Sequence, residues 1–252
     1  MSDFDRNVAA RGGFADRAAA VDAGLRAYML RVYNYMAAAV ALTGVVAYAT
    51  FNAAVVTDAS GKITALTPFG QTIFSGPLSI VLLLGTLGLV FFISFRINRL
   101  QYTTAMTLFM LYAALLGVTL SSIFLAYTGA SITRVFFISA ASFGALSLYG
   151  YTTQRDLSAM GSFMIMGLFG IIIASLVNIF LKSSGLDWAI SVIGVGVFAG
   201  LTAYDTQRIK EMYDSMDDDG TMGRKAIMGA LSLYLDFINL FLMLLRLVGD
   251  RR

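Results

Sequence analysis

The sequence predicts an all-α integral membrane protein with seven transmembrane helices. Of its 252 residues, 58% are hydrophobic and only 13% are charged, whereas soluble domains average about 45–50% apolar and about 25% charged residues. The apolar residues gather into seven stretches, each close to the roughly 20 residues that cross a bilayer. The chain contains no histidine and no cysteine. Disulfides, thiol nucleophiles, imidazole bases and Cys/His zinc sites are therefore excluded.

The seven predicted spans follow one another with short polar breaks between them. Their limits are 28–51, 76–95, 105–127, 132–151, 161–181, 188–207 and 227–248. The residues before the first span mix acidic and basic side chains with alanine and glycine, a composition typical of a mobile tail. The sequence thus predicts a cytoplasmic tail over residues 1–27 and a seven-helix transmembrane domain over residues 28–252.

The first span is expected to remain in the protein. The triplet Ala47-Tyr48-Ala49 fits a signal-peptidase site, but the tail before it is too long and the apolar stretch too complete for a cleaved signal peptide. When tails and loops are assigned alternately to the two sides, twelve of the 18 basic residues fall on the side of the N-terminus. The excess of basic residues on cytoplasmic loops then predicts a cytoplasmic N-terminus and an external C-terminus.

The fourth and sixth spans end in similar segments. Residues 151–155 read Tyr-Thr-Thr-Gln-Arg and residues 204–208 read Tyr-Asp-Thr-Gln-Arg, so that Thr152 is replaced by Asp205. This similarity favours helix hairpins related by duplication, although five residues can also match by chance. On this interpretation, two equivalent helix ends differ in a single carboxylate.

Only two acidic residues lie inside the predicted spans. Asp205 belongs to the sixth span and Asp236 to the seventh, while the other carboxylates lie in tails, loops or span edges. A charge near a helix centre costs roughly 2.5–3.5 kcal/mol on insertion scales and usually faces a bundle interior or a water-filled cavity. Ser232, Asp236 and Asn239 are spaced i, i+4 and i+7, so they share one helical face. We expect this polar face to turn toward a cavity.

Structural interpretations of the same residues remain open. Asp205 is also placed to pair with Arg208 one turn further along its helix. The structural alternative for Asp236 is a polar contact between helices without a functional role. The spacing of Gly196 and Gly200 favours close helix packing over ligand binding. The acidic run 217–219 is typical of a solvated loop, with the alternative that it concentrates cations near a pathway.

Two segments of the sequence resemble signature segments of a known family. Residues 200–207 read Gly-Leu-Thr-Ala-Tyr-Asp-Thr-Gln, and residues 233–241 read Leu-Tyr-Leu-Asp-Phe-Ile-Asn-Leu-Phe. Together they are similar to the motifs of the Bax inhibitor-1 (transmembrane Bax-inhibitor-motif) family, most like its bacterial YbhL-like branch. The resemblance extends from the first span to the C-terminus and implies a multi-pass protein of the bacterial inner membrane.

The resemblance implies six helices wrapped around a central seventh helix. It further implies that Asp205 and Asp236 form a pH-sensing pair in a calcium leak pathway. A basic residue at the cytoplasmic end of the second helix pairs with the first aspartate in the family, and Arg96 and Arg99 are the candidates here. The second span lacks the acidic residue that some relatives carry there, because residues 76–95 contain no Asp or Glu.

These observations favour a calcium leak whose pathway is gated by the two aspartates. Both carboxylates would contact calcium transiently, with Ser232 and Asn239 lining the pathway, and Ca²⁺ takes 6–8 oxygen ligands. Two adjacent carboxylates would titrate as one unit and bias the arrangement of the helices. The lipid bilayer and calcium ions are the expected partners. Calcium is the transported ion, and no cofactor is expected.

Two alternatives belong to other functional classes. The first is a regulatory protein that binds and restrains another membrane protein, such as a quality-control protease. The second is an intramembrane aspartyl protease, but Tyr234-Leu235-Asp236 stands where that class has Gly-x-Gly-Asp. We therefore expect no enzymatic activity. Nucleic acid is not an expected partner, because no stripe of Lys and Arg lies beside exposed aromatic residues.

Overall fold

The computed structural model describes the backbone of residues 3–58 and 62–252, and side chains from Asp22 onward within those ranges. Within these ranges, seven helices are long and apolar enough to cross a membrane. They are α1 (Asp3–Ala54), α3 (Pro77–Arg96), α4 (Tyr102–Leu120), α6 (Gly129–Thr152), α7 (Ser158–Leu181), α8 (Ser184–Glu211) and α9 (Asp219–Val248). The predicted fold class of seven transmembrane helices is confirmed.

The shorter elements lie between these helices. They are β1 (Val55–Thr57), β2 (Ile63–Leu66), α2 (Pro68–Phe74), the 3₁₀ helix η1 (Ile97–Arg99) and α5 (Ile123–Ala126). Strands β1 and β2 pair antiparallel, with Val55 opposite Leu66. This hairpin, which was not predicted from the sequence, occupies the polar break after the first span. The third predicted span is also interrupted, because the helix ends at Leu120 and α5 starts at Ile123.

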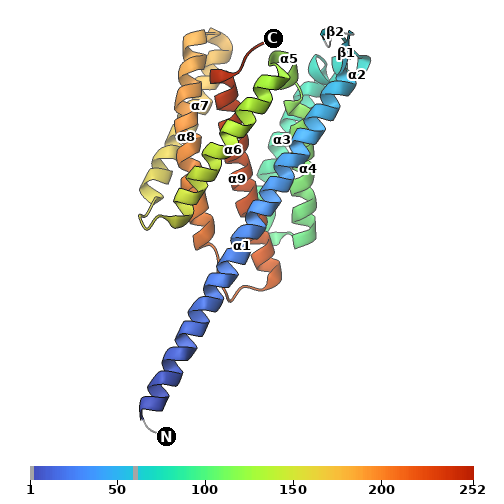
Figure 1. Ribbon diagram of the computed structural model, residues 1–252. Coiled ribbons are helices and arrows are strands. Elements are labelled where there is room, and N and C mark those ends of the chain that lie inside the picture. The colour runs from blue at the N-terminus through green and yellow to red at the C-terminus, as the bar shows by residue number, and fades with distance from the viewer. Residues whose placement is uncertain (1–2, 59–61) are drawn as a thin grey trace.

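α1 is longer than its predicted span. It begins at Asp3, so the predicted tail of residues 1–27 is helical from that residue and continuous with the first span. Figure 1 shows this N-terminal part of α1 projecting from the bundle. Its mobility and its cytoplasmic location stay predictions.

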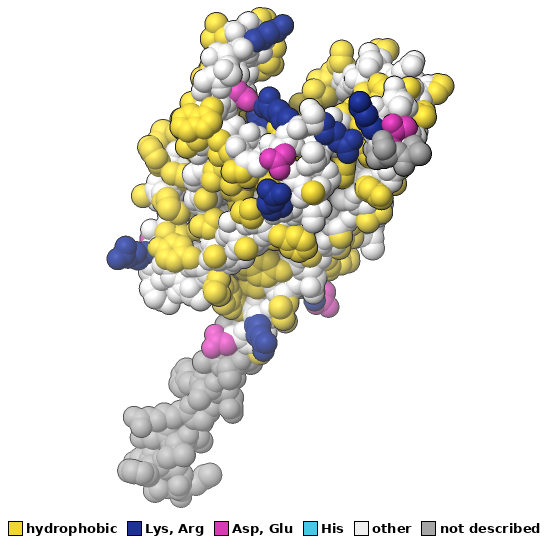
Figure 2. Space-filling view, turned by 45° about the horizontal axis from the view of Figure 1, so that its top comes forward, with side chains coloured by type: hydrophobic (Ala, Val, Ile, Leu, Met, Phe, Trp, Pro, Cys, Tyr) yellow, Lys and Arg dark blue, Asp and Glu magenta, His cyan; other side chains and the backbone are white. Residues whose placement is uncertain are grey.

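The start of α1 and the C-terminal residues lie on opposite sides of the bundle, as an odd number of spans requires (Figure 1). The C-terminal residues are tied to the start of α6, because Thr128 N–H donates to Asp250 O at 3.1 Å and Arg252 N–H donates to Ala126 O at 3.0 Å. In Figure 2, charged side chains are scattered over this end of the molecule, while hydrophobic side chains cover much of the flank. A bilayer surrounds such a flank at little cost, since it presents few polar groups.

α9 is the most buried of the spans. In its most apolar stretch, 67% of the residues are buried, against 6% in α7 and 11% in α3. It packs against α1, α4, α6 and α8, whereas α3 packs mainly on α4 and α7 mainly on α8. α9 is thus an inner helix with four principal neighbours. A ring of six helices around it, which the family resemblance implies, is not confirmed.

Candidate functional site

Close packing fixes the position of α8. A Cβ added to Gly150 of α6 would lie 2.2 Å from Ala203 O, and one added to Gly161 of α7 would lie 2.5 Å from the Tyr204 ring. Gly200 itself packs against Met164 of α7, whereas Gly196 has no atom within 4 Å of an added Cβ. Small residues allow such approaches in a membrane. Three contacts of this kind surround the turn that carries Asp205.

A buried hydroxyl pair holds the middle of α9 from the other side. Tyr234 is fully buried, and its hydroxyl lies 2.6 Å from Thr43 Oγ1 of α1. The Tyr234 ring meets Phe109 and Tyr112 of α4 edge to face. Because Asp236 follows Tyr234 by two residues, these contacts leave its side chain facing α8.

The carboxyl groups of Asp205 and Asp236 meet between the two helices. The two side chains form a hydrogen bond with each other. An ionised carboxylate only accepts, so a hydrogen bond between two carboxyl groups needs a proton on one of them. Asp236 is 5% exposed, and its Oδ2 has no hydrogen-bond partner among the described residues. We therefore expect the Asp205–Asp236 pair to share a proton, and it leaves one oxygen without a hydrogen-bond partner among the described residues.

Arg208 supplies the positive charge that acts on Asp205. Both residues line a cavity of about 30 Å³ together with Ser232 of α9. Arg96 ends α3 and Arg99 ends η1, and both are exposed. In the described part of the chain neither forms an ion pair with Asp205. Among the described residues Arg208 does not form an ion pair with Asp205 either. The pairing of Arg96 or Arg99 with Asp205, which the resemblance implies, stays a prediction.

Asn239 lies on the other side of the pair along α9. It lines a cavity of about 380 Å³ between α7, α8 and α9, with Arg246 at its far end. Its Nδ2 donates to Leu235 O at 2.8 Å, so this hydrogen bond does not involve the side-chain oxygen Oδ1. Along the polar face of α9, Ser232 thus lines the small cavity, Asp236 belongs to the acidic pair, and Asn239 lines the larger cavity.

The ends of α6 and α8 that carry the repeated segments lie side by side. Gln207 Oε1 accepts from Leu157 N–H at 2.8 Å, and Gln207 Nε2 donates to Arg155 O at 2.8 Å. Lys210 Nζ donates to Tyr151 O at 2.9 Å. The end of α8 therefore hydrogen-bonds to the segment at the end of α6, and Gln207 has a structural role in this contact. The duplication of the two segments stays a hypothesis.

A series of hydrogen-bonded hydroxyl groups leads from α1 to Thr206, the residue that follows Asp205. Tyr33 OH lies 2.6 Å from Ser147 Oγ, which lies 2.9 Å from Thr206 Oγ1. These residues were not predicted from the sequence, since a Tyr, a Ser and a Thr separated by up to 173 positions carry no recognisable spacing. Arg208 was predicted only as a structural partner of Asp205.

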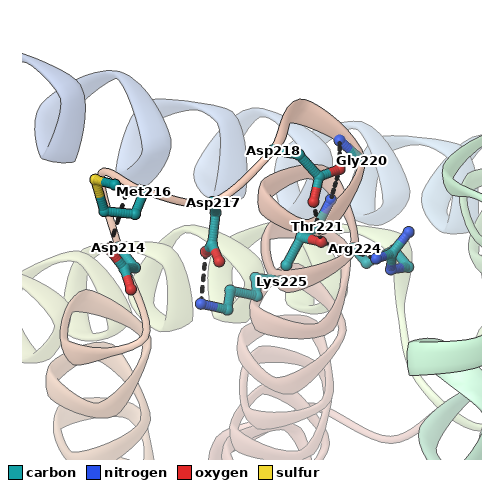
Figure 3. Close-up of polar contacts among 8 residues, drawn as sticks. All are labelled: Asp214, Met216, Asp217, Asp218, Gly220, Thr221, Arg224 and Lys225. Carbon is teal, nitrogen blue, oxygen red and sulfur yellow. Dashed lines mark hydrogen bonds and ion pairs between the residues drawn. The ribbon is translucent and has the colours of Figure 1, made fainter.

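The acidic run before α9 has structural roles (Figure 3). Asp218 caps α9, because its Oδ2 accepts from Gly220 N–H at 3.0 Å and Thr221 N–H at 3.1 Å. The side-chain hydrogen bond from Thr221 is the largest influence that lowers the pKa of Asp218. Asp217 pairs with Lys225 at 2.5 Å. Within the described residues, no group of three acidic side chains is placed to hold a metal ion.

A family model with the description "Inhibitor of apoptosis-promoting Bax1" matches residues 25–252. The chain belongs to the Bax inhibitor-1 family. It is 49% identical to the inner membrane protein YbhL of Escherichia coli, over 91% of this chain and 94% of that protein. It is 52% identical to protein RP147 of Rickettsia prowazekii over 92% of each chain, and 44% identical to a Caulobacter vibrioides protein over the whole of both.

These relatives and the seven apolar helices identify a multi-pass protein of the bacterial inner membrane. The match begins at residue 25, close to the point where the bundle begins. It includes both helices that carry the acidic pair. The orientation of the N-terminus stays a prediction.

Proposed function

We propose that this Bax inhibitor-1 family protein is a calcium leak whose pathway is controlled by the protonation of the Asp205–Asp236 pair. The observation that supports the proposal most directly is the position of the pair between two cavities on one polar face of α9. A charged pair at that depth is expensive to bury, and such residues usually serve ion or proton pathways.

The chemistry of the pair suits a transient calcium contact. With its proton removed, the pair offers four carboxylate oxygens, and Ser232 and Asn239 add neutral oxygens on either side. Water and main-chain carbonyls would complete the 6–8 ligands that Ca²⁺ takes. A site of only two acidic residues binds weakly enough to release the ion, which conduction requires.

Protonation would change the balance between arrangements of α8 and α9. The protonated pair is held together by its hydrogen bond, whereas two ionised carboxylates repel each other. The deprotonated state therefore favours either separation of the helices or a cation between them. Arg208 competes with that cation for Asp205, since it lines the same cavity.

The test is ion flux through liposomes that contain the purified protein. Flux of Ca²⁺, K⁺ and Na⁺ is measured over a range of pH, with empty liposomes as the control. We expect calcium flux that changes with pH and exceeds the flux of the monovalent ions. A flat response from a folded protein would contradict the leak and favour the alternative, a regulatory protein that binds and restrains another membrane protein such as a quality-control protease.

A further inference from the structure

A long apolar groove runs between α1 and α6 on the flank of the bundle. Its cavity of about 640 Å³ lies within the roughly 300–1,000 Å³ of ligand sites. The residues that form its apolar walls are Met29, Leu30 and Met36 of α1 and Phe143, Gly144 and Leu148 of α6. Met29, Met36 and Phe143 are buried, whereas Leu30 and Leu148 are 52% and 63% exposed. The groove therefore has a packed floor and a rim open to the lipid.

The groove is long enough to extend through one leaflet of the bilayer. On α1 it reaches from Arg26 to Ala37, which corresponds to roughly 16 Å of helix. Half of the hydrocarbon core measures about 15 Å. A site of this length, open to the side, accommodates one extended acyl chain and leaves the headgroup at its end.

The two ends of the groove differ in charge. Arg26 lines one end, where Lys210 lies 5.6 Å over the ring of Tyr151, another residue of the groove. Gly144 and Ala37 line the other, apolar end. Among the described side chains none forms an ion pair with Arg26, so its guanidinium is available to a ligand. Basic pockets between transmembrane helices bind anionic lipid headgroups.

The polar groups of the floor are satisfied within the protein. Tyr33 and Ser147, which both line the groove, bond to each other at 2.6 Å. Ser147 also bonds to Thr206 of α8. An apolar chain laid over this floor leaves these hydrogen bonds intact, which favours an acyl chain over a polar ligand.

We propose that the groove between α1 and α6 binds an anionic phospholipid from the leaflet at the N-terminal end of the bundle. One acyl chain occupies the groove, and the phosphate contacts Arg26. This site is independent of the proposed calcium leak, because the groove lies outside the cavities that flank the Asp205–Asp236 pair.

The test is native mass spectrometry of the full chain in detergent, titrated with phosphatidylglycerol or with phosphatidylcholine of identical acyl chains. We expect one retained phosphatidylglycerol, with a preference of about five-fold, because one basic residue near the membrane surface contributes about that factor. Arg26→Gln should remove the preference and keep the chain-dependent binding. Arg99→Gln is the matched control, because Arg99 is exposed at η1 and does not line the groove.

A second pair of variants tests the groove itself. Gly144→Leu should abolish retention of both lipids, because an added Cβ meets nothing within 4 Å and the side chain would fill the groove without disturbing the fold. Ala37→Leu should act in the same direction from α1. Gly170→Leu on α7 is the control, since Gly170 has the same open surroundings outside the groove. Unchanged retention in Gly144→Leu, or an unchanged preference in Arg26→Gln, would overturn the proposal and leave only non-specific lipid around the bundle.

Discussion

Asp205 of α8 and Asp236 of α9 bond to each other through their carboxyl groups inside a bundle whose other described spans bury no acidic side chain. The hydrogen bond exists only while one proton is present. We therefore expect a change of pH to alter this contact between two transmembrane helices. The larger of the two adjoining cavities lies between the same helices and α7.

Replacing either acid by its amide should remove the pH response of calcium flux. Asp205→Asn and Asp236→Asn keep the volume of the side chain and its hydrogen bonding but cannot titrate. In liposomes we expect flux that varies by less than about two-fold between about pH 5 and about pH 8. Asp214→Asn in the loop before α9 is a matched control and should respond like the wild type. Wild-type pH dependence in both variants of the pair would refute its sensing role, provided that thermal melting shows them folded.

Three arginine variants distinguish the partner of Asp205. In this arrangement Arg208 acts on Asp205 and neither Arg96 nor Arg99 does. Arg208→Gln removes a positive charge and so favours the protonated carboxyl, which should move the midpoint of the flux response to higher pH. The expected shift is roughly 0.3 pH unit, because an i,i+3 pair on a helix contributes about 0.2–0.5 kcal/mol and one pH unit corresponds to about 1.4 kcal/mol. Arg96→Gln and Arg99→Gln should leave the midpoint in place; a larger shift in either would identify that residue as the partner in another conformation.

Two glycine variants test the packing that positions Asp205. Gly150→Ala places a methyl group 2.2 Å from the main-chain oxygen of Ala203. Because a backbone cannot move aside as a side chain does, we expect a loss of about 1–3 kcal/mol in stability. Gly170→Ala meets nothing within 4 Å and should be neutral or stabilising by up to about 1 kcal/mol. Thermal melting in detergent compares them, and equal melting temperatures would show that α6 and α8 are not in close contact there.

Cysteine labelling tests the predicted orientation. The chain has no cysteine, so a single introduced thiol is the only reactive one. Lys62→Cys lies beyond the first span, and Met216→Cys lies in the loop before α9 at a position that is 89% exposed. With a cytoplasmic N-terminus, a membrane-impermeant maleimide should label Lys62→Cys in intact spheroplasts and Met216→Cys only after lysis. The reverse pattern would invert the topology.

The sequence predicted the spans well because the cost of burying charge in a bilayer acts on each helix separately. The same cost singled out Asp205 and Asp236, which are the only acids inside the predicted spans. The i, i+4, i+7 spacing further predicted that Ser232 and Asn239 share a face with Asp236, and both line cavities on that side. Periodicity within one helix therefore carried most of the predictable part of the site.

Contacts between helices were harder to predict. The bond between Tyr33 and Ser147 joins residues 114 positions apart, and hydroxyl side chains occur throughout the spans without a distinguishing pattern. The basic partner of Asp205 could not be predicted from the sequence, because helix ends carry several basic residues and only packing decides which one is near. The β1–β2 hairpin was missed since three- and four-residue strands lie within a break that also contains turn-forming residues.

The stability of the start of α9 should depend on pH. Hydrogen bonds from Thr221 and Gly220 lower the pKa of Asp218 in the folded protein. A carboxylate with a lowered folded pKa stabilises the fold above its unfolded pKa, and this contribution disappears as the pH falls through the folded pKa. Asp218→Ala should therefore lower the melting temperature at neutral pH, whereas Asp218→Asn should retain most of the cap, since asparagine is also a good N-cap residue. At neutral pH the melting temperature of the wild type should equal or exceed that of Asp218→Asn. As the pH falls, it should decrease toward the melting temperature of Asp218→Ala, because Asp218 loses the charge that favours a helix N-terminus. A difference between the wild type and Asp218→Asn that stays constant from neutral to acidic pH would show that the charge of Asp218 contributes nothing to the start of α9.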